Sequence, residues 1–73
     1  MLWHNIVSSH LEAVSYDPLY STCYIKFKSG AIYAYLRVPA SVYYAWLVAP
    51  SHGVYHNQHM RNQYEYKLIQ KIA

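Results

Sequence analysis

The sequence of 73 residues lacks several features on which small domains commonly rely. It contains one cysteine, Cys23, so no disulfide can form within the chain, and it has three acidic residues against six lysines and arginines. The longest uncharged apolar stretch, residues 38–50, is shorter than the roughly 20 residues that span a bilayer, and proline and serine interrupt it. These shortages exclude a disulfide scaffold and predict no membrane span.

The chain has the length of one domain and leaves no room for a multidomain enzyme, so we treat residues 1–73 as a single domain. Cys23 lies between Thr22 and Tyr24 in a strand-like run, where a lone cysteine is typically a small buried hydrophobe of a reducing compartment. The segment Met1-Leu2-Trp3-His4 has neither the basic nor the apolar region of a secretory signal. We therefore expect a cytoplasmic protein.

Tyrosine is the residue that the sequence has in excess, with ten copies in a chain that has one phenylalanine and two tryptophans. A domain of this size buries only about 60% of its unfolded surface, so several tyrosine rings must lie outside the core. Rings with an apolar body and a polar tip suit an interface or a stacking platform. We expect either a second subunit or a ligand to cover them.

Strands are predicted on both sides of the Ser29-Gly30 pair. Residues 23–28 and 32–38 alternate between apolar and polar or aromatic side chains, which is typical of a β-hairpin. A two-residue turn would pair Lys26 with Tyr33 and Tyr24 with Tyr35, which gives one apolar face and one aromatic, basic face. Residues 10–16 are predicted as an earlier strand with a bulge between Ala13 and Val14.

Two helices are predicted after the hairpin. Pro39 suits a first helical turn, and residues 42, 43, 46 and 47 then form one apolar stripe that ends at Pro50. Ser51 is suited to cap a second helix that runs to about residue 62, and residues 64–69 alternate weakly. We thus predict an α+β fold: a small antiparallel sheet of three strands, or four with the C-terminal segment, and two short helices packed on one face.

Short motifs occur in a fixed order along the chain: Tyr33-Ala34-Tyr35, Val38-Pro39, Ser51-His52-Gly53 followed by Asn57, and Tyr64-Glu65-Tyr66. In this order they resemble the KTSC domain family over nearly the whole chain. That family occurs at the C-terminus of some lysyl-tRNA synthetases and as small stand-alone proteins of bacteria and phages, and RNA binding has been suggested for it. His56 stands where the family usually has an aromatic residue, so this position either packs differently or serves a ligand.

The aromatic, basic face of the predicted hairpin is the first candidate site. Rings stack on bases at about 1–3 kcal/mol each, and interleaved cations neutralise phosphates. An oligomer interface and an ordinary solvated surface are the alternatives for this face. Its candidate ligand-binding residues are Tyr24, Lys26, Tyr33, Tyr35 and Arg37.

The second helix is the other candidate site. A serine cap followed by Gly53 would leave backbone amides open to an anion, and Asn57 and Arg61 are spaced to share one face. The alternative is that Ser51 is only a cap and Gly53 a packing contact. The ligand-binding set from this segment and the tail is Ser51, Gly53, Tyr55, His56, Asn57, Arg61 and Tyr64.

Metal binding and catalysis have weak support. His52, His56 and His59 share one helix face, but no carboxylate or second cysteine lies within their segment to complete a zinc site. The three carboxylates are isolated along the chain, so no acid/base pair is evident. We expect no metal, no cofactor and no catalytic residues, and a phosphodiesterase that uses two of the histidines is the enzymatic alternative.

These observations together predict a non-catalytic module that binds a nucleotide-containing ligand as a homo-oligomer. The family context adds a concrete version, a phage protein that sequesters a small nucleotide immune signal of the cyclic oligonucleotide or ADP-ribose type in an infected bacterial cell. RNA binding is one alternative, although a net charge of +3 is small for a polymer binder. A protein interaction domain without a nucleotide ligand is the other.

Overall fold

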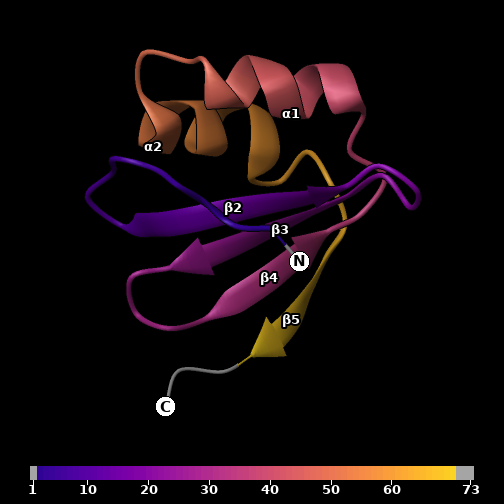
Figure 1. Ribbon diagram of the computed structural model, residues 1–73, viewed down its shortest axis with the longest axis horizontal. Coiled ribbons are helices and arrows are strands. Elements are labelled where there is room, and N and C mark those ends of the chain that lie inside the picture. Colours follow the sequence, from indigo (N-terminus) through magenta and orange to yellow (C-terminus); the bar gives the residue numbers. More distant parts are fainter. Residues whose placement is uncertain (1, 71–73) are drawn as a thin grey trace.

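An antiparallel sheet of five strands carries two helical segments on one face in the computed structural model, which describes residues 2–70 (Figure 1). The elements in chain order are β1 (His4–Asn5), β2 (Leu11–Asp17), β3 (Thr22–Phe27), β4 (Ile32–Tyr35), α1 (Ala40–Leu47), α2 (His52–Tyr55), the π-helical turn η1 (His56–Met60) and β5 (Tyr66–Gln70). The α+β class is confirmed. The predicted number of strands was too low, because the two-residue β1 gives no periodic signal and the weakly alternating tail does form a strand.

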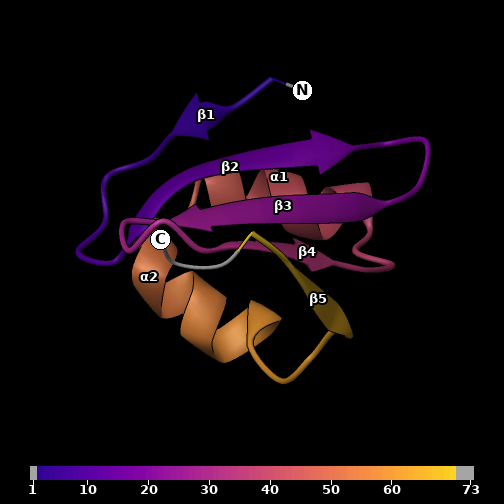
Figure 2. The same ribbon diagram turned by 90° about the horizontal axis from the view of Figure 1, so that it is seen from below.

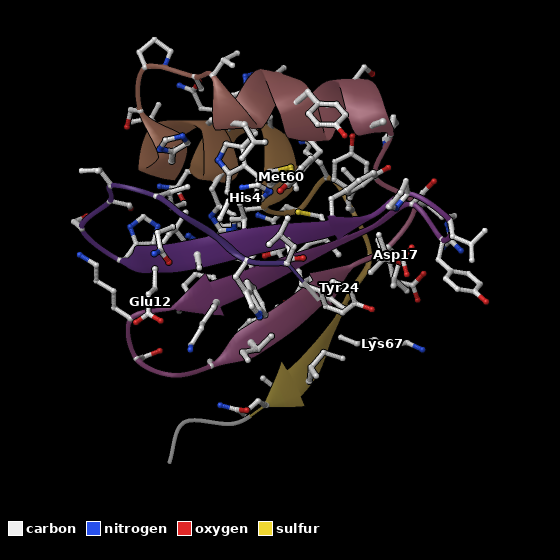
Figure 3. All side chains as sticks on the ribbon, viewed as in Figure 1. His4, Glu12, Asp17, Tyr24, Met60 and Lys67 are labelled. Atoms are coloured by element: carbon white, nitrogen blue, oxygen red, sulfur yellow. The ribbon has the colours of Figure 1, made fainter. Side chains whose placement is uncertain are left out.

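The strands follow one another across the sheet in sequence order, from β1 at one edge to β5 at the other (Figure 2). Every neighbouring pair is antiparallel. Both helical segments lie on the same side of this sheet, here called the helix-covered face, and the other side is called the open face. Tyr24 and Lys67 lie on the open face, whereas Met60 lies between the helices and the sheet (Figure 3).

The β3–β4 hairpin has a register that differs by one residue from the predicted one. Phe27 and not Lys28 closes the loop, since its N–H donates to the Ala31 carbonyl at 2.9 Å and its carbonyl accepts from the Gly30 N–H at 2.9 Å. The loop therefore has three residues, and Gly30 has a φ of +101°, which only glycine adopts without strain. Ile25 is opposite Tyr33, and Cys23 is opposite Tyr35.

A shift of one residue moves a whole strand to the opposite face, because side chains alternate with a period of two. Tyr33 and Tyr35 therefore share the helix-covered face with Cys23 and Ile25, and not the open face with Tyr24. Tyr35 is 5% exposed. The prediction of one aromatic, basic hairpin face was wrong, since tyrosine is amphipathic and its pattern is compatible with either face.

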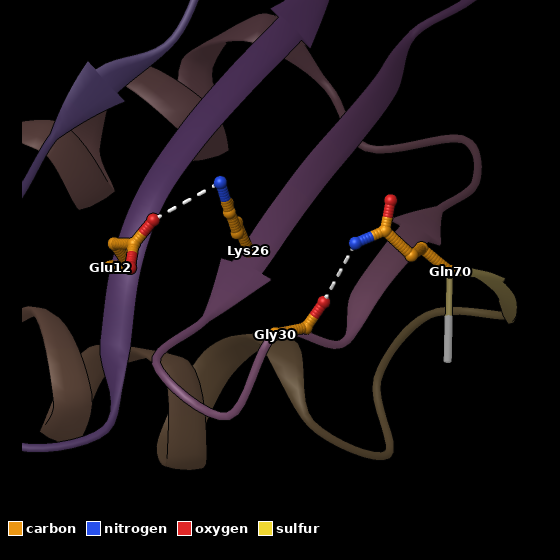
Figure 4. A network of polar contacts seen from close by, with 4 residues as sticks. All are labelled: Glu12, Lys26, Gly30 and Gln70. Carbon is orange, nitrogen blue, oxygen red and sulfur yellow. Dashed lines mark hydrogen bonds and ion pairs between the residues drawn. The ribbon is translucent and has the colours of Figure 1, made fainter. Parts of the chain in front are cut away.

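The predicted bulge in the first strand exists one residue earlier than expected. Leu11 is opposite Phe27 and Ala13 is opposite Lys26, so Glu12 is the additional residue on β2. The bulge brings Leu11 and Val14 to the same face, and both are fully buried. The Glu12 carboxylate lies 3.2 Å from the Lys26 ammonium across the two strands (Figure 4).

The first helix packs as predicted. Pro39 is its N-cap, and Tyr43 and Trp46 from its apolar stripe are 2% and 0% exposed. The Trp46 indole N–H donates to the His52 carbonyl at 2.9 Å, and the His52 ring donates to the Leu47 carbonyl at 3.1 Å. These two bonds fix the start of α2 against the end of α1. Among the described residues, no helix is long and apolar enough to cross a membrane.

The hairpin loop provides a test of the backbone conformation at Gly30. We expect Gly30→Ala to reduce the free energy of unfolding by about 1–2 kcal/mol, because a side chain at positive φ is strained, even though an added Cβ would contact nothing within 4 Å. Ser29→Ala, in the same exposed loop, is the matched control. Urea denaturation measures both, and equal stabilities of the two variants would contradict a left-handed Gly30.

Candidate functional site

A pocket of about 420 Å³, here called the aromatic pocket, opens on the helix-covered side of β4 and β5, beside η1. Three parts of the chain that are distant in sequence form its walls: the strands and their hairpin loop, the helical segment, and the loop that precedes β2. The lining residues are His10, Phe27, Ser29, Ala31, Tyr33, Tyr35, His56, Asn57, Arg61, Asn62 and Tyr66.

Aromatic rings in contact with one another form the strand side of this pocket. The Tyr66 ring stacks on Tyr35 with centroids 5.4 Å apart and meets Tyr33 edge-on at 5.6 Å. Tyr33 in turn contacts Phe27 edge-on at 5.6 Å. Tyr66 is 53% exposed, so one face of this ring cluster remains available to a planar ligand.

His56 connects the pocket to the core. Its ring is 4% exposed and contacts Phe27, Tyr35 and Trp46 at centroid distances of 5.8, 5.8 and 6.2 Å. Its Nε2 is 3.1 Å from the Tyr35 hydroxyl, and its Nδ1 has no hydrogen-bond partner among the described residues. We expected this position either to pack differently from the aromatic residue that is usual in the family or to serve a ligand. The His56 ring instead packs among aromatic rings, as such a residue would, and it also lines the pocket.

The surroundings of Tyr35 and His56 shift the pKa of each side chain in the direction that favours its neutral form. Burial, followed by the nearby Tyr66 and Tyr33, raises the pKa of Tyr35 to about 12. Burial is also the main cause that lowers the pKa of His56, and the His10 ring and the Arg61 guanidinium act in the same direction. The Asn57 side chain acts in the opposite direction but does not outweigh them.

The rim of the aromatic pocket supplies polar groups. Arg61, Asn57 and Asn62 are exposed there. Within residues 2–70, ion pairs join Lys26 to Glu12 and Arg37 to Glu65, and neither includes Arg61. No carboxylate lines the pocket in the described part of the chain, so its one guanidinium is placed to meet an anion.

The residues predicted from the hairpin are divided between two faces. Tyr33 and Tyr35 line the aromatic pocket, whereas Tyr24 and Lys26 lie on the open face. Arg37 lies beyond the end of β4 with a φ of +55°, and its guanidinium is bonded to Glu65 at 2.6 Å. These five residues therefore do not form one surface.

The residues predicted from the second helix are also divided. His56, Asn57 and Arg61 line the aromatic pocket, whereas Tyr55 and Tyr64 line a separate pocket of about 330 Å³. Tyr55 also donates from its hydroxyl to the Val42 carbonyl of α1 at 3.3 Å.

Ser51 and Gly53 lie at the start of α2. The Ser51 hydroxyl oxygen accepts from the Val54 N–H at 3.3 Å, which confirms the cap. An added Cβ at Gly53 would lie 2.9 Å from Cε1 of His10, so Gly53 is a close packing contact. Whether either residue contacts a ligand stays a prediction.

The histidine and carboxylate side chains do not gather into one cluster in the described part of the chain. Among the described residues, no three histidine, cysteine or acidic side chains are grouped to hold a metal ion. Glu12 and Glu65 form the two ion pairs, and the Asp17 carboxylate accepts from the Leu19 N–H at 3.0 Å in the turn after β2. Cys23 is fully buried, and burial raises the pKa of its thiol to about 12.

Sequence reasoning missed six lining residues of the aromatic pocket: His10, Phe27, Ser29, Ala31, Asn62 and Tyr66. Tyr66 belongs to the second Tyr-x-Tyr motif, which was a usable signal for a ring near Tyr35. Asn62 follows the helical segment directly and has a φ of +64°. His10 and Phe27 carry no local signal, since only the pairing of β2 with β3 brings them to this pocket.

The buried His56 predicts a dependence of stability on pH. Because its folded-state pKa lies below the unfolded value of about 6.5, its contribution is complete above pH 6.5 and is lost as the pH falls below that value. We expect His56→Phe to fold and to reduce the loss of stability between pH 6.5 and 5. Thermal unfolding across this range measures it, and His59→Phe, at an exposed position of η1, is the control.

The comparisons with known proteins agree on one family. The KTSC domain model matches residues 7–64. The chain is 36% identical over 61 residues to a lysine–tRNA ligase of Nostoc sp. and 40% identical over 57 residues to a protein of unassigned function from Stutzerimonas stutzeri. These matches cover 84% and 78% of this chain, but they span 11% of the ligase and 80% of the second protein.

The fold matches the crystal structure of a KTSC domain protein from Yersinia pestis. The TM-score is 0.89 at 24% identity, and the match covers 94% of this chain and 97% of the other. At that identity the likeness establishes the fold alone. Together with the match of the family model to most of the sequence, it shows that this chain belongs to the KTSC domain family.

Proposed function

We propose that the chain is a non-catalytic module that binds a nucleotide in the aromatic pocket. The observation that carries the proposal is one guanidinium, Arg61, at the rim of a pocket walled by stacked tyrosines and without a carboxylate among its described lining residues. A base stacks on an aromatic face, amide side chains hydrogen-bond its edge, and a phosphate pairs with arginine. The pocket supplies all three groups, and its volume is typical of small-ligand sites.

The exposed face of Tyr66 is the proposed stacking surface. Its ring already rests on Tyr35 and Tyr33, so a base placed on it would need little reordering of the protein. Asn57 and Asn62 lie on the helical side of the same pocket, where their amides can both donate to and accept from a base edge.

The three carboxylates and the buried His56 support binding without catalysis, because each is engaged in other contacts. All three carboxylates take part in ion pairs or a turn at other places, and the His56 Nε2 is held by the Tyr35 hydroxyl inside the core. A module of this kind removes a ligand from solution without consuming it. Sequestering a small nucleotide signal, of the cyclic oligonucleotide or ADP-ribose type, in a bacterial or phage-infected cell is the role we propose.

RNA is the alternative ligand. One observation favours it: a relative at 36% identity is named a lysine–tRNA ligase, an enzyme that acts on tRNA. The net charge of +3 and the single cation at the pocket favour a compact ligand with few phosphates instead. We also propose a homo-oligomer, in which the edge strand β5, with Leu68 and Ile69 exposed, is the surface for a second copy.

Alanine substitutions test the pocket. We expect Tyr66→Ala to weaken binding of a ribonucleotide by about 5- to 150-fold, the equivalent of about 1–3 kcal/mol of lost stacking. Isothermal titration with ribonucleotides measures the change. Tyr20→Ala, at an exposed turn position, controls for the loss of a tyrosine, and Tyr24→Ala reports on the open face. Weakening by Tyr24→Ala but not by Tyr66→Ala would move the site to the open face.

Salt dependence separates the two ligand classes in the same titrations. RNA that contacts several cations loses affinity steeply as salt rises, whereas a ligand held by one arginine and stacking loses little. An absence of heat with every nucleotide, together with a protein partner that is retained, would favour the interaction-domain alternative.

A further inference from the structure

A third pocket, of about 210 Å³, adjoins the aromatic pocket on the side of α2. His10 and Asn57 line both pockets and therefore form their common wall. This third pocket, here called the serine pocket, has the further lining residues Val7, Ser8, Ser9, Ser51, Gly53 and Val54. The two pockets that share His10 and Asn57 are here together called the groove.

The chemistry of the serine pocket differs from that of its neighbour. Its walls carry three hydroxyl groups, one imidazole and one amide, and no tyrosine, tryptophan or phenylalanine lines it in the described chain. The Ser8 oxygen accepts from the His10 and Leu11 N–H groups at 3.4 and 3.3 Å, so its own proton is left for another acceptor. Hydroxyl donors beside an imidazole suit sugar and phosphate oxygens more than a base.

Gly53 leaves room for the His10 ring between the pockets. Any Cβ at position 53 would lie 2.9 Å from Cε1 of the His10 ring and 3.4 Å from the Ser8 hydroxyl oxygen. The ring also lies edge-on to His56, with centroids 6.1 Å apart. A side chain at position 53 would therefore displace His10, which lines both pockets.

We propose that the groove binds a ligand of the dinucleotide class, two nucleosides joined through phosphate, and that the serine pocket is the subsite for its second sugar–phosphate unit. The inference rests on the proposed function, because it assumes that the aromatic pocket takes the first base. Arg61 lies in the aromatic pocket and His10 at the junction, so the linking phosphate lies between two nitrogen donors. A mononucleotide fills only one part of this groove.

Two matched substitutions test the subsite. Val54→Glu places a carboxylate at an exposed position that lines only the serine pocket, and Val48→Glu makes the same change at an exposed position at the end of α1. Isothermal titration compares the four ribonucleoside 5′-monophosphates with the corresponding 5′-phosphorylated homodinucleotides. We expect the preferred dinucleotide to bind wild-type protein about tenfold or more tightly than its mononucleotide, the worth of one good charge-assisted hydrogen bond.

We expect Val54→Glu to abolish most of this tenfold gain and to leave mononucleotide affinity within about twofold, since the added charge repels only the second unit. Val48→Glu should change neither affinity. Ser9→Glu, at another exposed position that lines only the serine pocket, provides an independent variant if Val54→Glu fails to fold.

The outcomes separate the two proposals. Mononucleotide binding without a dinucleotide gain, or a gain that survives both Val54→Glu and Ser9→Glu, overturns the second subsite and leaves the proposed function standing. Failure of every mononucleotide and dinucleotide to bind overturns both.

Discussion

The hydrogen bond between the Tyr35 hydroxyl and the His56 imidazole joins strand β4 to the helical layer. It bridges residues of β4 and η1 at 3.1 Å, inside a cluster in which His56 also contacts Trp46 of α1. Among the side-chain hydrogen bonds of residues 2–70, it is the one that joins two buried side chains. The position of the helical segment over β4, and with it the shape of the aromatic pocket, therefore depends on this pair.

The burial of His56 against Tyr35 also explains why the aromatic pocket has apolar residues at its base and polar residues at its rim. His56 begins a widened turn in which the Arg61 N–H donates to the His56 carbonyl at 2.8 Å, five residues back. With His56 and Met60 both buried, Asn57 and Arg61 are left exposed at the pocket mouth. Such π turns recur at functional sites in proteins, since they place side chains that a regular helix would turn elsewhere.

Much of the architecture was predictable because periodicity reflects burial. Alternation located β3 and β4, and the stripe that includes Tyr43 and Trp46 identified the buried side of α1. The register was not predictable in the same way. Ile32 and Ala34 are as suitable for a core as Tyr33 and Tyr35 are, so the sequence is compatible with both loop lengths, and the longer loop brings the tyrosine pair under the helices.

The candidate site was predictable only in part, for a related reason. His56, Asn57 and Arg61 are neighbours in one segment, so local reasoning grouped them correctly. Tyr66 and His10 reach the same pocket from opposite ends of the chain, through the pairing of β5 with β4 and of β2 with β3. No local pattern encodes that proximity, which exists only after the sheet has formed.

The residue pair that closes the β3–β4 hairpin determines which face the Tyr-x-Tyr motif occupies. Phe27 and Ala31 close the loop in this chain, and with this pairing Tyr33 and Tyr35 lie beneath the helices. Deleting Gly30 alone would leave a two-residue turn between the same closing pair, so both tyrosines would keep their face. A relative with a shorter hairpin loop therefore keeps this motif in its core when the missing residue lies between the closing pair, and an alignment should place the gap there.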